Sequence, residues 1–241
     1  MITELLTPEN FVALLTLTSL EIVLGIDNIV FIAIIAGRLP KERRDSARLI
    51  GLSLAIISRL LLLFSLAWLA SLRSPLFEIL GQPFSGRDLI LIAGGMFLIY
   101  KATKEIHAKT TGEQDDLLGE EGAKRVTLKS IVTQIIIIDL IFSLDSVITA
   151  VGMTNNLPVM GTAVVLAVVV MLLFSKKIVD FIDDNPTVKM LALSFLLMIG
   201  LVLVADGFGR HIEKGYVYFA MGFSFLVEML NLKAGKSKAD Q

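Results

Sequence analysis

Long blocks of apolar residues alternate with short charged segments along most of this chain. A helix needs roughly 20 predominantly apolar residues to cross a bilayer, and most of the blocks approach that length. The pattern therefore predicts an all-α, polytopic membrane protein with seven transmembrane helices. The expected spans are Pro8–Ala36, Ala47–Leu72, Asp88–Tyr100, Leu128–Val151, Pro158–Phe174, Val188–Ala205 and Gly215–Leu232.

Composition agrees with this pattern and removes several classes of function. Hydrophobic residues make up 55% of the 241 positions, and the mean hydropathy is +0.78. The net charge of −1 gives no overall field that would attract nucleic acid. The absence of cysteine excludes disulfides, thiolate metal sites, iron–sulfur clusters and thiol nucleophiles. The first residues lack the basic start of a cleavable signal peptide, so we expect the first span to stay in the mature protein.

Lysine and arginine are concentrated in every second gap between the spans. They cluster after the first, third, fifth and seventh spans, whereas the gaps between those hold two, none and two such residues. Positively charged loops stay in the cytoplasm, so this alternation predicts an outside N-terminus and a cytoplasmic C-terminus.

Two of the spans carry a matching pair of acids. Leu20-Glu21-Ile22-Val23-Leu24-Gly25-Ile26-Asp27-Asn28 and Ile138-Asp139-Leu140-Ile141-Phe142-Ser143-Leu144-Asp145-Ser146 each hold two carboxylates six residues apart, followed by a small polar residue. A carboxylate at the bilayer centre costs roughly 2.5–3.5 kcal/mol on insertion scales. Four of them in the membrane predict a functional site, and the interpretation we favour is a paired cation-binding site in a transporter.

The spacing of the two motifs predicts an internal repeat. Glu21 precedes Asp139 by 118 residues, and Asp27 precedes Asp145 by the same number. Three spans separate the equivalent helices, so the two halves would insert in opposite senses and place a site between them at the midplane. Within one transmembrane domain, 1–241, we expect repeat 1 at about 8–103, a solvated cytoplasmic linker at about 104–127, repeat 2 at about 128–206 and a seventh helix at about 215–232.

Helical geometry divides the polar residues of each motif between two directions. Glu21, Gly25 and Asn28 share one face of a helix, as do Asp139, Ser143 and Ser146. Asp27 and Asp145 lie about 120° away from those faces in a regular helix. Either the helices unwind near Gly25 and Ser143 and free carbonyl oxygens, or each helix directs one acid to the cavity and one to a neighbour.

Carboxylates, an amide and hydroxyls are hard oxygen ligands, which suit Mg²⁺, Ca²⁺ or Mn²⁺. The two histidines, His107 and His211, lie outside the predicted spans. Without a metal, some of the acids should take up protons, because burial and like-charge repulsion disfavour the charged form. Proton exchange is therefore the expected energy source, with sodium as an alternative.

A purely structural interpretation stays open beside the functional one. Arg59 is the one basic residue inside a predicted span, and it could neutralise one acid but not four. Asn28, Ser143 and Ser146 could serve as hydrogen-bonding contacts between helices.

The two acidic motifs resemble those of the TerC family of integral membrane proteins. The runs Lys189-Met190-Leu191-Ala192-Leu193-Ser194-Phe195-Leu196 and Lys214-Gly215-Tyr216-Val217-Tyr218-Phe219-Ala220-Met221 are similar to the same family, and the resemblance extends from Phe11 to Leu232. It implies a seven-helix protein of the bacterial inner membrane, related to the LysE transporter superfamily, that exports manganese. In some members it implies delivery of metal to exported proteins.

The resemblance also implies a set of site residues. Glu21, Asp27, Asp139 and Asp145 are the candidate metal ligands, with Asn28, Ser143 and Ser146 beside them. Some relatives continue into cytoplasmic nucleotide-binding-like domains, and we expect this sequence to be a short form without them.

We therefore expect a transporter that exports Mn²⁺ as its substrate, with Ca²⁺ or Mg²⁺ as alternatives, and protons as the counter-ion. The alternative is a non-transporting membrane factor that loads metal onto exported proteins or assembles them. We do not expect an enzyme, because the Gly-x-Gly-Asp signature of intramembrane aspartyl proteases and the Gly-x-Ser-x-Gly elbow are both missing. Expected partners are the lipid bilayer and a divalent cation but no nucleic acid. The oligomeric state stays open, a homo-oligomer included.

Overall fold

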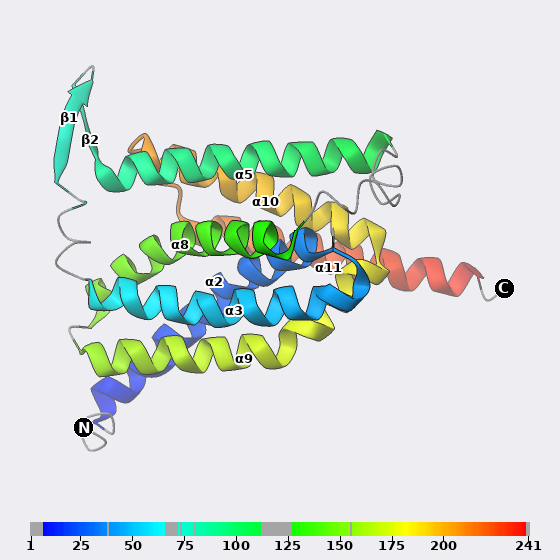
Figure 1. Cartoon of the computed structure of the whole chain (residues 1–241), viewed down its shortest axis with the longest axis horizontal. Helices are drawn as coiled ribbons and strands as arrows, with labels where there is room; N and C mark the ends of the chain where they lie inside the picture. Colours follow the sequence, from blue (N-terminus) through cyan, green and yellow to red (C-terminus); the bar gives the residue numbers. More distant parts are fainter. Residues whose placement is uncertain are drawn as a thin grey trace. The chain divides into compact units, whose positions relative to one another are not determined.

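The computed structural model describes residues 7–37, 39–65, 72, 74–79, 81–111, 127–154 and 156–239. The side chains at positions 27, 41, 145, 148, 149, 152, 153 and 235–239 lie outside this description. Within the described ranges, the chain forms seven helices and one two-stranded hairpin (Figure 1). The predicted number of helices is therefore confirmed for the described part of the chain.

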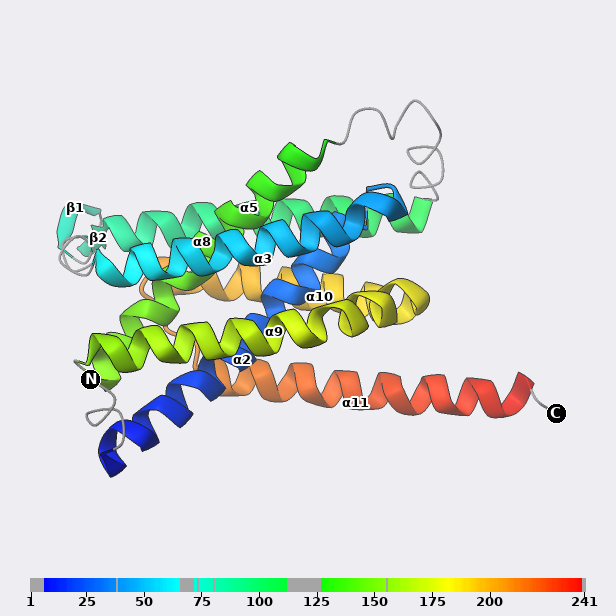
Figure 2. The ribbon, with the colours of Figure 1, turned by 60° about the horizontal axis from the view of Figure 1, so that its bottom comes forward.

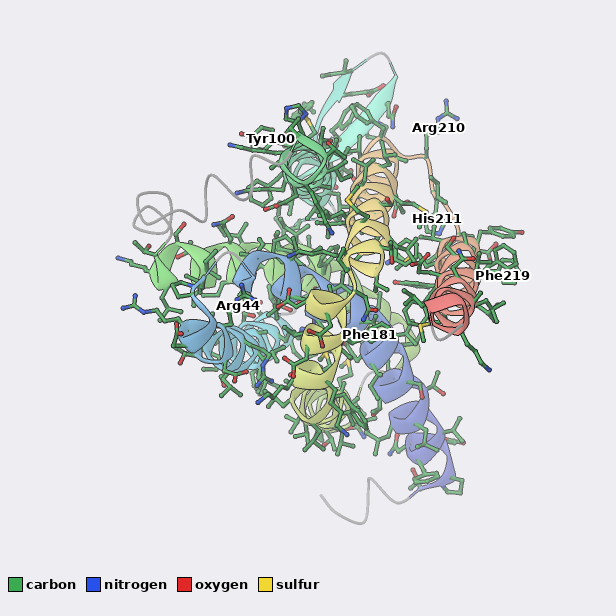
Figure 3. All side chains as sticks on the ribbon, turned by 90° about the vertical axis from the view of Figure 1, so that its right-hand side faces the viewer. Arg44, Tyr100, Phe181, Arg210, His211 and Phe219 are labelled. Atoms are coloured by element: carbon green, nitrogen blue, oxygen red, sulfur yellow. The ribbon has the colours of Figure 1, made fainter. Side chains whose placement is uncertain are left out.

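The helix α2 (Pro8–Ala36) begins and ends at residues whose polar groups fit its termini. The Thr7 hydroxyl accepts a hydrogen bond from the Asn10 amide, and Pro8 occupies the first turn, where no amide hydrogen is needed. At the other end, Arg44 donates to the carbonyl oxygens of Gly37 (2.8 Å) and Leu39 (2.9 Å). Arg44, labelled in Figure 3, belongs to α3 (Lys41–Phe64), so this contact closes the corner between two consecutive helices.

The segment after α3 contains an antiparallel hairpin that the sequence did not predict. Strand β1 (Pro75–Ile79) pairs with β2 (Gln82–Ser85), and the turn uses Gly81 at φ +80°, a conformation that favours glycine. The rings of Phe77 and Phe84 stack at 5.7 Å between centroids. The hairpin is a small addition to a fold that is otherwise helical.

The chain divides into two compact units, and the first is built from helices of both halves of the sequence. Unit 1 covers Met1–Gly86 and Asp115–Phe181. It contains α2, α3, the hairpin, α8 (Leu128–Met153) and most of α9 (Leu157–Asp184). Helix α8 packs against both α2 and α3, and α3 and α9 run alongside each other (Figure 2).

Unit 2 covers Arg87–Gln114 and Ile182–Gln241. Its helices are α5 (Gly86–Thr111), α10 (Pro186–Gly207) and α11 (Lys214–Ala239). Helices α5 and α10 approach closely at two glycines. A Cβ atom added to Gly95 would lie 2.5 Å from the Gly200 carbonyl oxygen, and one added to Gly200 would lie 2.9 Å from the Gly95 carbonyl oxygen. The absence of side chains at both positions allows the two backbones to touch.

Substitution of Gly95 by leucine should therefore destabilise unit 2. We expect a loss of about 1–3 kcal/mol, because the obstructing atoms belong to the backbone of α10 and must move apart. Thermal unfolding in detergent measures the change. Gly222→Leu on α11 is the matched control, since nothing lies within 4 Å of the position of its added Cβ. Equal stability of the two variants would contradict the close crossing.

Five of the described helices are long and apolar enough to cross a membrane: α2, α3, α9, α10 and α11. The last of these has 6% of its apolar window buried inside the protein. Tyr216 and Phe219 on this helix have 73% and 76% of their surface exposed, and Phe219 is labelled in Figure 3. Such a helix fits a lipid environment, where apolar side chains need no protein partner.

Several expected boundaries differ from the helix ends, and two of these differences change the interpretation. Helix α9 continues to Asp184, ten residues past the expected end of the span, so Asp180, Asp183 and Asp184 lie on a helix. Helix α5 continues to Thr111, so the first part of the expected linker is helical. In both cases the apolar run ends before the helix does, because a helix can continue into polar residues without a break. The rest of the linker, 112–126, lies outside the described residues, and the inverted repeat stays a prediction.

Candidate functional site

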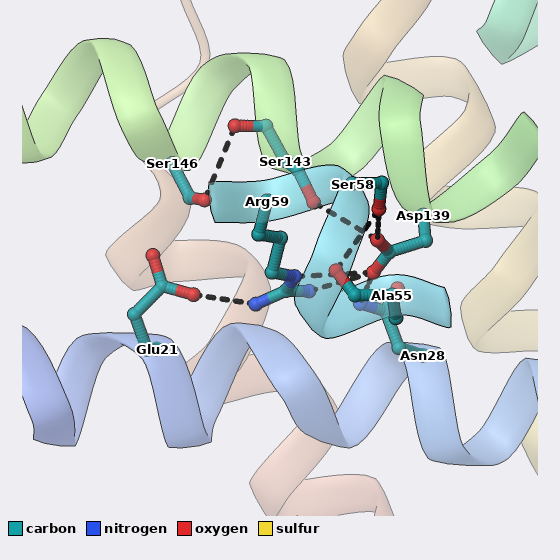
Figure 4. Close-up of polar contacts among 8 residues, drawn as sticks. All are labelled: Glu21, Asn28, Ala55, Ser58, Arg59, Asp139, Ser143 and Ser146. Atoms are coloured by element: carbon teal, nitrogen blue, oxygen red, sulfur yellow. Dashed lines mark hydrogen bonds and ion pairs between the residues drawn. The ribbon is translucent and has the colours of Figure 1, made fainter. Parts of the chain in front are cut away.

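A cluster of buried polar side chains lies between α2, α3 and α8 in unit 1 (Figure 4). Each of the three helices is otherwise rich in apolar residues, so the cluster is an exception that needs an explanation. Six of its members expose 6% of their surface or less, and Ser58 is half-buried. The members are Glu21 and Asn28 on α2, Ser58 and Arg59 on α3, and Asp139, Ser143 and Ser146 on α8.

Arg59 stands at the centre and bridges two carboxylates. Its Nη1 atom donates to Glu21 Oε2 at 2.5 Å, and its Nη2 atom donates to Asp139 Oδ1 at 2.9 Å. A third contact joins Nε to the same Asp139 oxygen at 3.2 Å. The guanidinium group presents its donors in a planar fork, which allows one side chain to pair with an acid on each side.

Asp139 is surrounded by hydrogen-bond donors. An ionised carboxylate offers about four lone-pair sites. Oδ1 accepts from Asn28 Nδ2 (3.0 Å) as well as from two nitrogens of Arg59. Oδ2 accepts from Ser143 Oγ (3.3 Å), and Ser58 Oγ lies 3.0 Å away, where its single hydrogen is shared with the Ala55 carbonyl oxygen (2.9 Å). The lone pairs of Oδ1 are therefore fully used by protein groups.

Asn28 contributes differently with its two polar atoms. Its amide nitrogen binds Asp139, but among the described residues its buried Oδ1 atom has no hydrogen-bond partner. Asn28, Arg59 and Asp139 line a small cavity whose other lining residues, such as Ile138 and Met171, are apolar. The cavity volume is about 10 Å³, enough for about one water-sized guest. An unpaired buried oxygen is costly, and a bound cation or water at this place would satisfy it.

The packing of α9 closes this region from another side. Met171 lies against Gly25, where an added Cβ would collide with the methionine sulfur. Gly25 lies one turn before Asn28 on the same face of α2. The glycine therefore lets α9 approach α2 beside the cavity.

The charges of the cluster do not cancel. By formal charge, two carboxylates and one guanidinium leave one negative charge among Glu21, Arg59 and Asp139. Asp27 and Asp145 lie on the same two helices, α2 and α8. Net negative charge in a region of low dielectric attracts cations strongly.

The structure brings together five of the seven predicted site residues: Glu21, Asn28, Asp139, Ser143 and Ser146. The remaining two, Asp27 and Asp145, have side chains outside the described part of the structure. Helices α2 and α8 run through both motifs without a break, so of the two expected arrangements the unwound one is absent here. Among the described side chains, no three acids or histidines come together as a metal-binding group.

The central position of Arg59 is the feature that sequence reasoning missed. We expected this residue to neutralise one acid but not four, and it pairs with two. Ser58, its neighbour, was not among the predicted site residues. The available signal was an arginine inside a span, since such residues face a protein interior and pair with acids. Its second partner was not predictable, because the contact joins residues 80 positions apart.

Two other buried polar groups in the described ranges, around Asp206 and Arg48, have structural explanations. Near the end of α10, Asp206 accepts a hydrogen bond from the Ile212 amide (3.4 Å) and lies 3.2 Å from His211 Nδ1. These contacts hold the turn into α11, where His211 is labelled in Figure 3. On α3, the buried Arg48 pairs with Asp45 and with Ser175 of α9. Neither group combines net negative charge with a cavity.

Long apolar helices around a buried, charged cluster define a polytopic membrane protein with an intramembrane polar site. The family model described as "Integral membrane protein TerC family" matches residues 6–241. The chain therefore belongs to the TerC family, as its acidic motifs indicated.

Curated relatives agree with this membership. The chain is 55% identical over 227 residues to the inner membrane protein YoaE of Escherichia coli, covering 94% of this chain but 43% of that protein. It is 52% identical to the inner membrane protein YgdQ of Escherichia coli and 51% identical to a UPF0053 protein of Haemophilus influenzae. Each of these two alignments covers 94–95% of this chain and 94–95% of the relative. The chain thus spans less than half of YoaE and nearly all of the other two, and no solved structure matches it significantly.

Proposed function

We propose that this protein transports divalent metal cations across the inner membrane and that its main substrate is Mn²⁺. The observation that carries the proposal is the buried, negatively charged cluster around Asp139, with a small cavity and an unpaired amide oxygen on Asn28. A purely structural cluster would be expected to balance its charges and pair its polar atoms. The cluster around Asp139 leaves a negative charge and the unpaired Oδ1 atom of Asn28 beside the small cavity.

The chemistry of the donors favours a hard divalent cation. Every candidate ligand in the cluster is an oxygen, from carboxylates, an amide or hydroxyls, and these suit Mn²⁺, Ca²⁺ and Mg²⁺. Asp27, Asp139 and Asp145 are the proposed metal ligands, and Glu21 serves as a ligand or proton carrier. The choice of Mn²⁺ follows the resemblance to the TerC family.

Direction and coupling complete the proposal. The distribution of lysine and arginine supports an outside N-terminus and a cytoplasmic C-terminus, and export follows the family resemblance. When the metal leaves, the cluster holds several carboxylates that can take up protons in its place. Protons moving inward are therefore the proposed counter-ion.

The proposal predicts the manganese content of living cells. Cells that overproduce the protein should accumulate less Mn²⁺ than cells with an empty vector, and Asp27→Asn or Asp145→Asn should abolish the difference. Either substitution removes one charge from the site while keeping the size of the side chain. Elemental analysis of washed cells measures the content, and Glu9→Gln, which alters an exposed acid on the first turn of α2, is the matched control.

Two results would contradict the proposal in different ways. If cells with the Asp27 or Asp145 variant hold as little manganese as cells with the wild-type protein, these residues do not belong to the site. If cells with the wild-type protein hold as much manganese as cells with an empty vector, while the purified protein binds the metal, the result would favour a factor that loads metal onto exported proteins.

A further inference from the structure

The contacts of Arg59 assign it a role in substrate exchange beyond neutralising charge. We infer that Arg59 is a built-in counter-cation, which occupies the cation site in the substrate-free state and must release Asp139 before the metal binds there. The inference rests on the proposed function and adds the residue that controls access of the substrate to its ligand.

The first argument is the saturation of Asp139 Oδ1. This oxygen accepts three hydrogen bonds, two from Arg59 and one from Asn28, and they use its lone pairs. A metal ion can coordinate a carboxylate oxygen only through a lone pair. Asp139 Oδ1 therefore cannot bind a cation until some of these donors withdraw.

The second argument identifies which donor must withdraw. Asn28, Ser58 and Ser143 are neutral and also carry oxygens that a cation would attract. Arg59 alone is positively charged, and it repels a divalent cation across the few ångströms of the cluster. Like charges a few ångströms apart repel strongly in a region of low dielectric constant, and the metal carries twice the charge of Arg59. Arg59 and the substrate thus compete for the same carboxylate.

The third argument concerns where Arg59 goes. Its Nη1 atom is bound to Glu21, whereas Nη2 and Nε are bound to Asp139. The contact with Glu21 can persist when the opposite edge of the guanidinium group leaves Asp139. Glu21 thus keeps the arginine paired while the metal is bound, which avoids an isolated buried charge.

The experiment measures Mn²⁺ binding to the purified full-length protein by isothermal titration calorimetry. Arg59→Gln removes the competing charge, so the Mn²⁺ affinity should rise by at least about tenfold, or 1.4 kcal/mol. Arg48→Gln is the matched control, because Arg48 is a second buried arginine on α3 that contacts Asp45 and Ser175 instead of Asp139. Its Mn²⁺ affinity should equal that of the wild type.

A second variant separates competition from a simple change in charge. Glu21→Gln combined with Arg59→Gln keeps the net charge of the cluster and still frees Asp139. It should bind Mn²⁺ more tightly than the wild type. Where neither variant folds, Arg59→Lys decides, because an ammonium group lacks the planar fork that holds both acids at once and should give a smaller rise in affinity.

Transport provides a readout that a structural defect would not produce. In vesicles, Arg59→Gln should lower both the KM for Mn²⁺ and the maximal rate, since the metal binds tightly and leaves slowly. A merely damaged protein would lose maximal rate without gaining affinity.

The outcomes distinguish this inference from the proposed function. If the wild type transports Mn²⁺ but folded Arg59 variants bind it no more tightly than the wild type, the role inferred for Arg59 is overturned and the proposed function stands. Absence of both binding and flux in the wild type and in every variant would overturn the proposed function as well.

Discussion

Replacement of Arg59 by methionine should lower the free energy of unfolding by about 3–5 kcal/mol, because it leaves two buried carboxylates without their cation. Glu21 and Asp139 each expose 3% of their surface, so water cannot replace the lost partner. The side chain of methionine fills much of the space of arginine, which limits the contribution of a cavity. Denaturant unfolding in mixed micelles measures the change.

The control for this variant is Arg43→Met, an exposed position on the same helix. Its stability should stay within about 0.5 kcal/mol of the wild type. A loss below 1 kcal/mol for Arg59→Met would contradict the bridged pair of acids shown in Figure 4.

The same reasoning predicts a compensating variant. When Glu21→Gln and Asp139→Asn accompany Arg59→Met, no charged group remains in the triad, and at least half of the lost stability should return. Neutral replacements of a whole buried ion cluster are often tolerated, whereas removal of a single partner is not. The compensated variant should still fail to transport, which separates stability from function.

Asp139→Asn should reduce the initial rate of Mn²⁺ transport by at least about a hundredfold. The substitution removes the acid that contacts four other residues of the cluster, and it points an amide group toward donors that need an acceptor. Asp139→Glu keeps the charge but displaces it by one methylene, so the transport rate should fall less, by about tenfold. Mn²⁺ uptake into everted membrane vesicles measures these rates.

Asp180→Asn is the control for the transport measurement, because this acid is exposed on α9. It should transport at the wild-type rate. A folded Asp139→Asn protein that also transports at that rate would show that Asp139 is not a ligand of the substrate.

Much of the fold could be predicted from the apolar pattern, and the errors have physical causes. The apolar runs located all seven helices, because a membrane span requires a long apolar sequence. They could not locate the ends of α5 and α9, since those helices continue into polar segments. The hairpin Pro75–Ser85 was missed because its two strands are five and four residues long and mostly exposed, too short for a clear periodic signal.

The candidate site was predictable in its residues but not in its pairing. Helical spacing placed Glu21 with Asn28 and Asp139 with Ser143, because these positions share a face in any regular helix. Arg59 comes from a third helix, and spacing along one helix says nothing about contacts between helices. Its role as a bridge could therefore be found only from the packing of α3 against α2 and α8.

Metal flux through proteoliposomes containing the purified protein tests the cation-binding role of the buried acids most directly. Mn²⁺, Ca²⁺ and Mg²⁺ are supplied in parallel to the wild type and to Asp145→Asn. We predict saturable Mn²⁺ flux that the substitution abolishes. Absence of flux for all three ions in the wild type, with the protein folded and correctly inserted, would contradict a transporter.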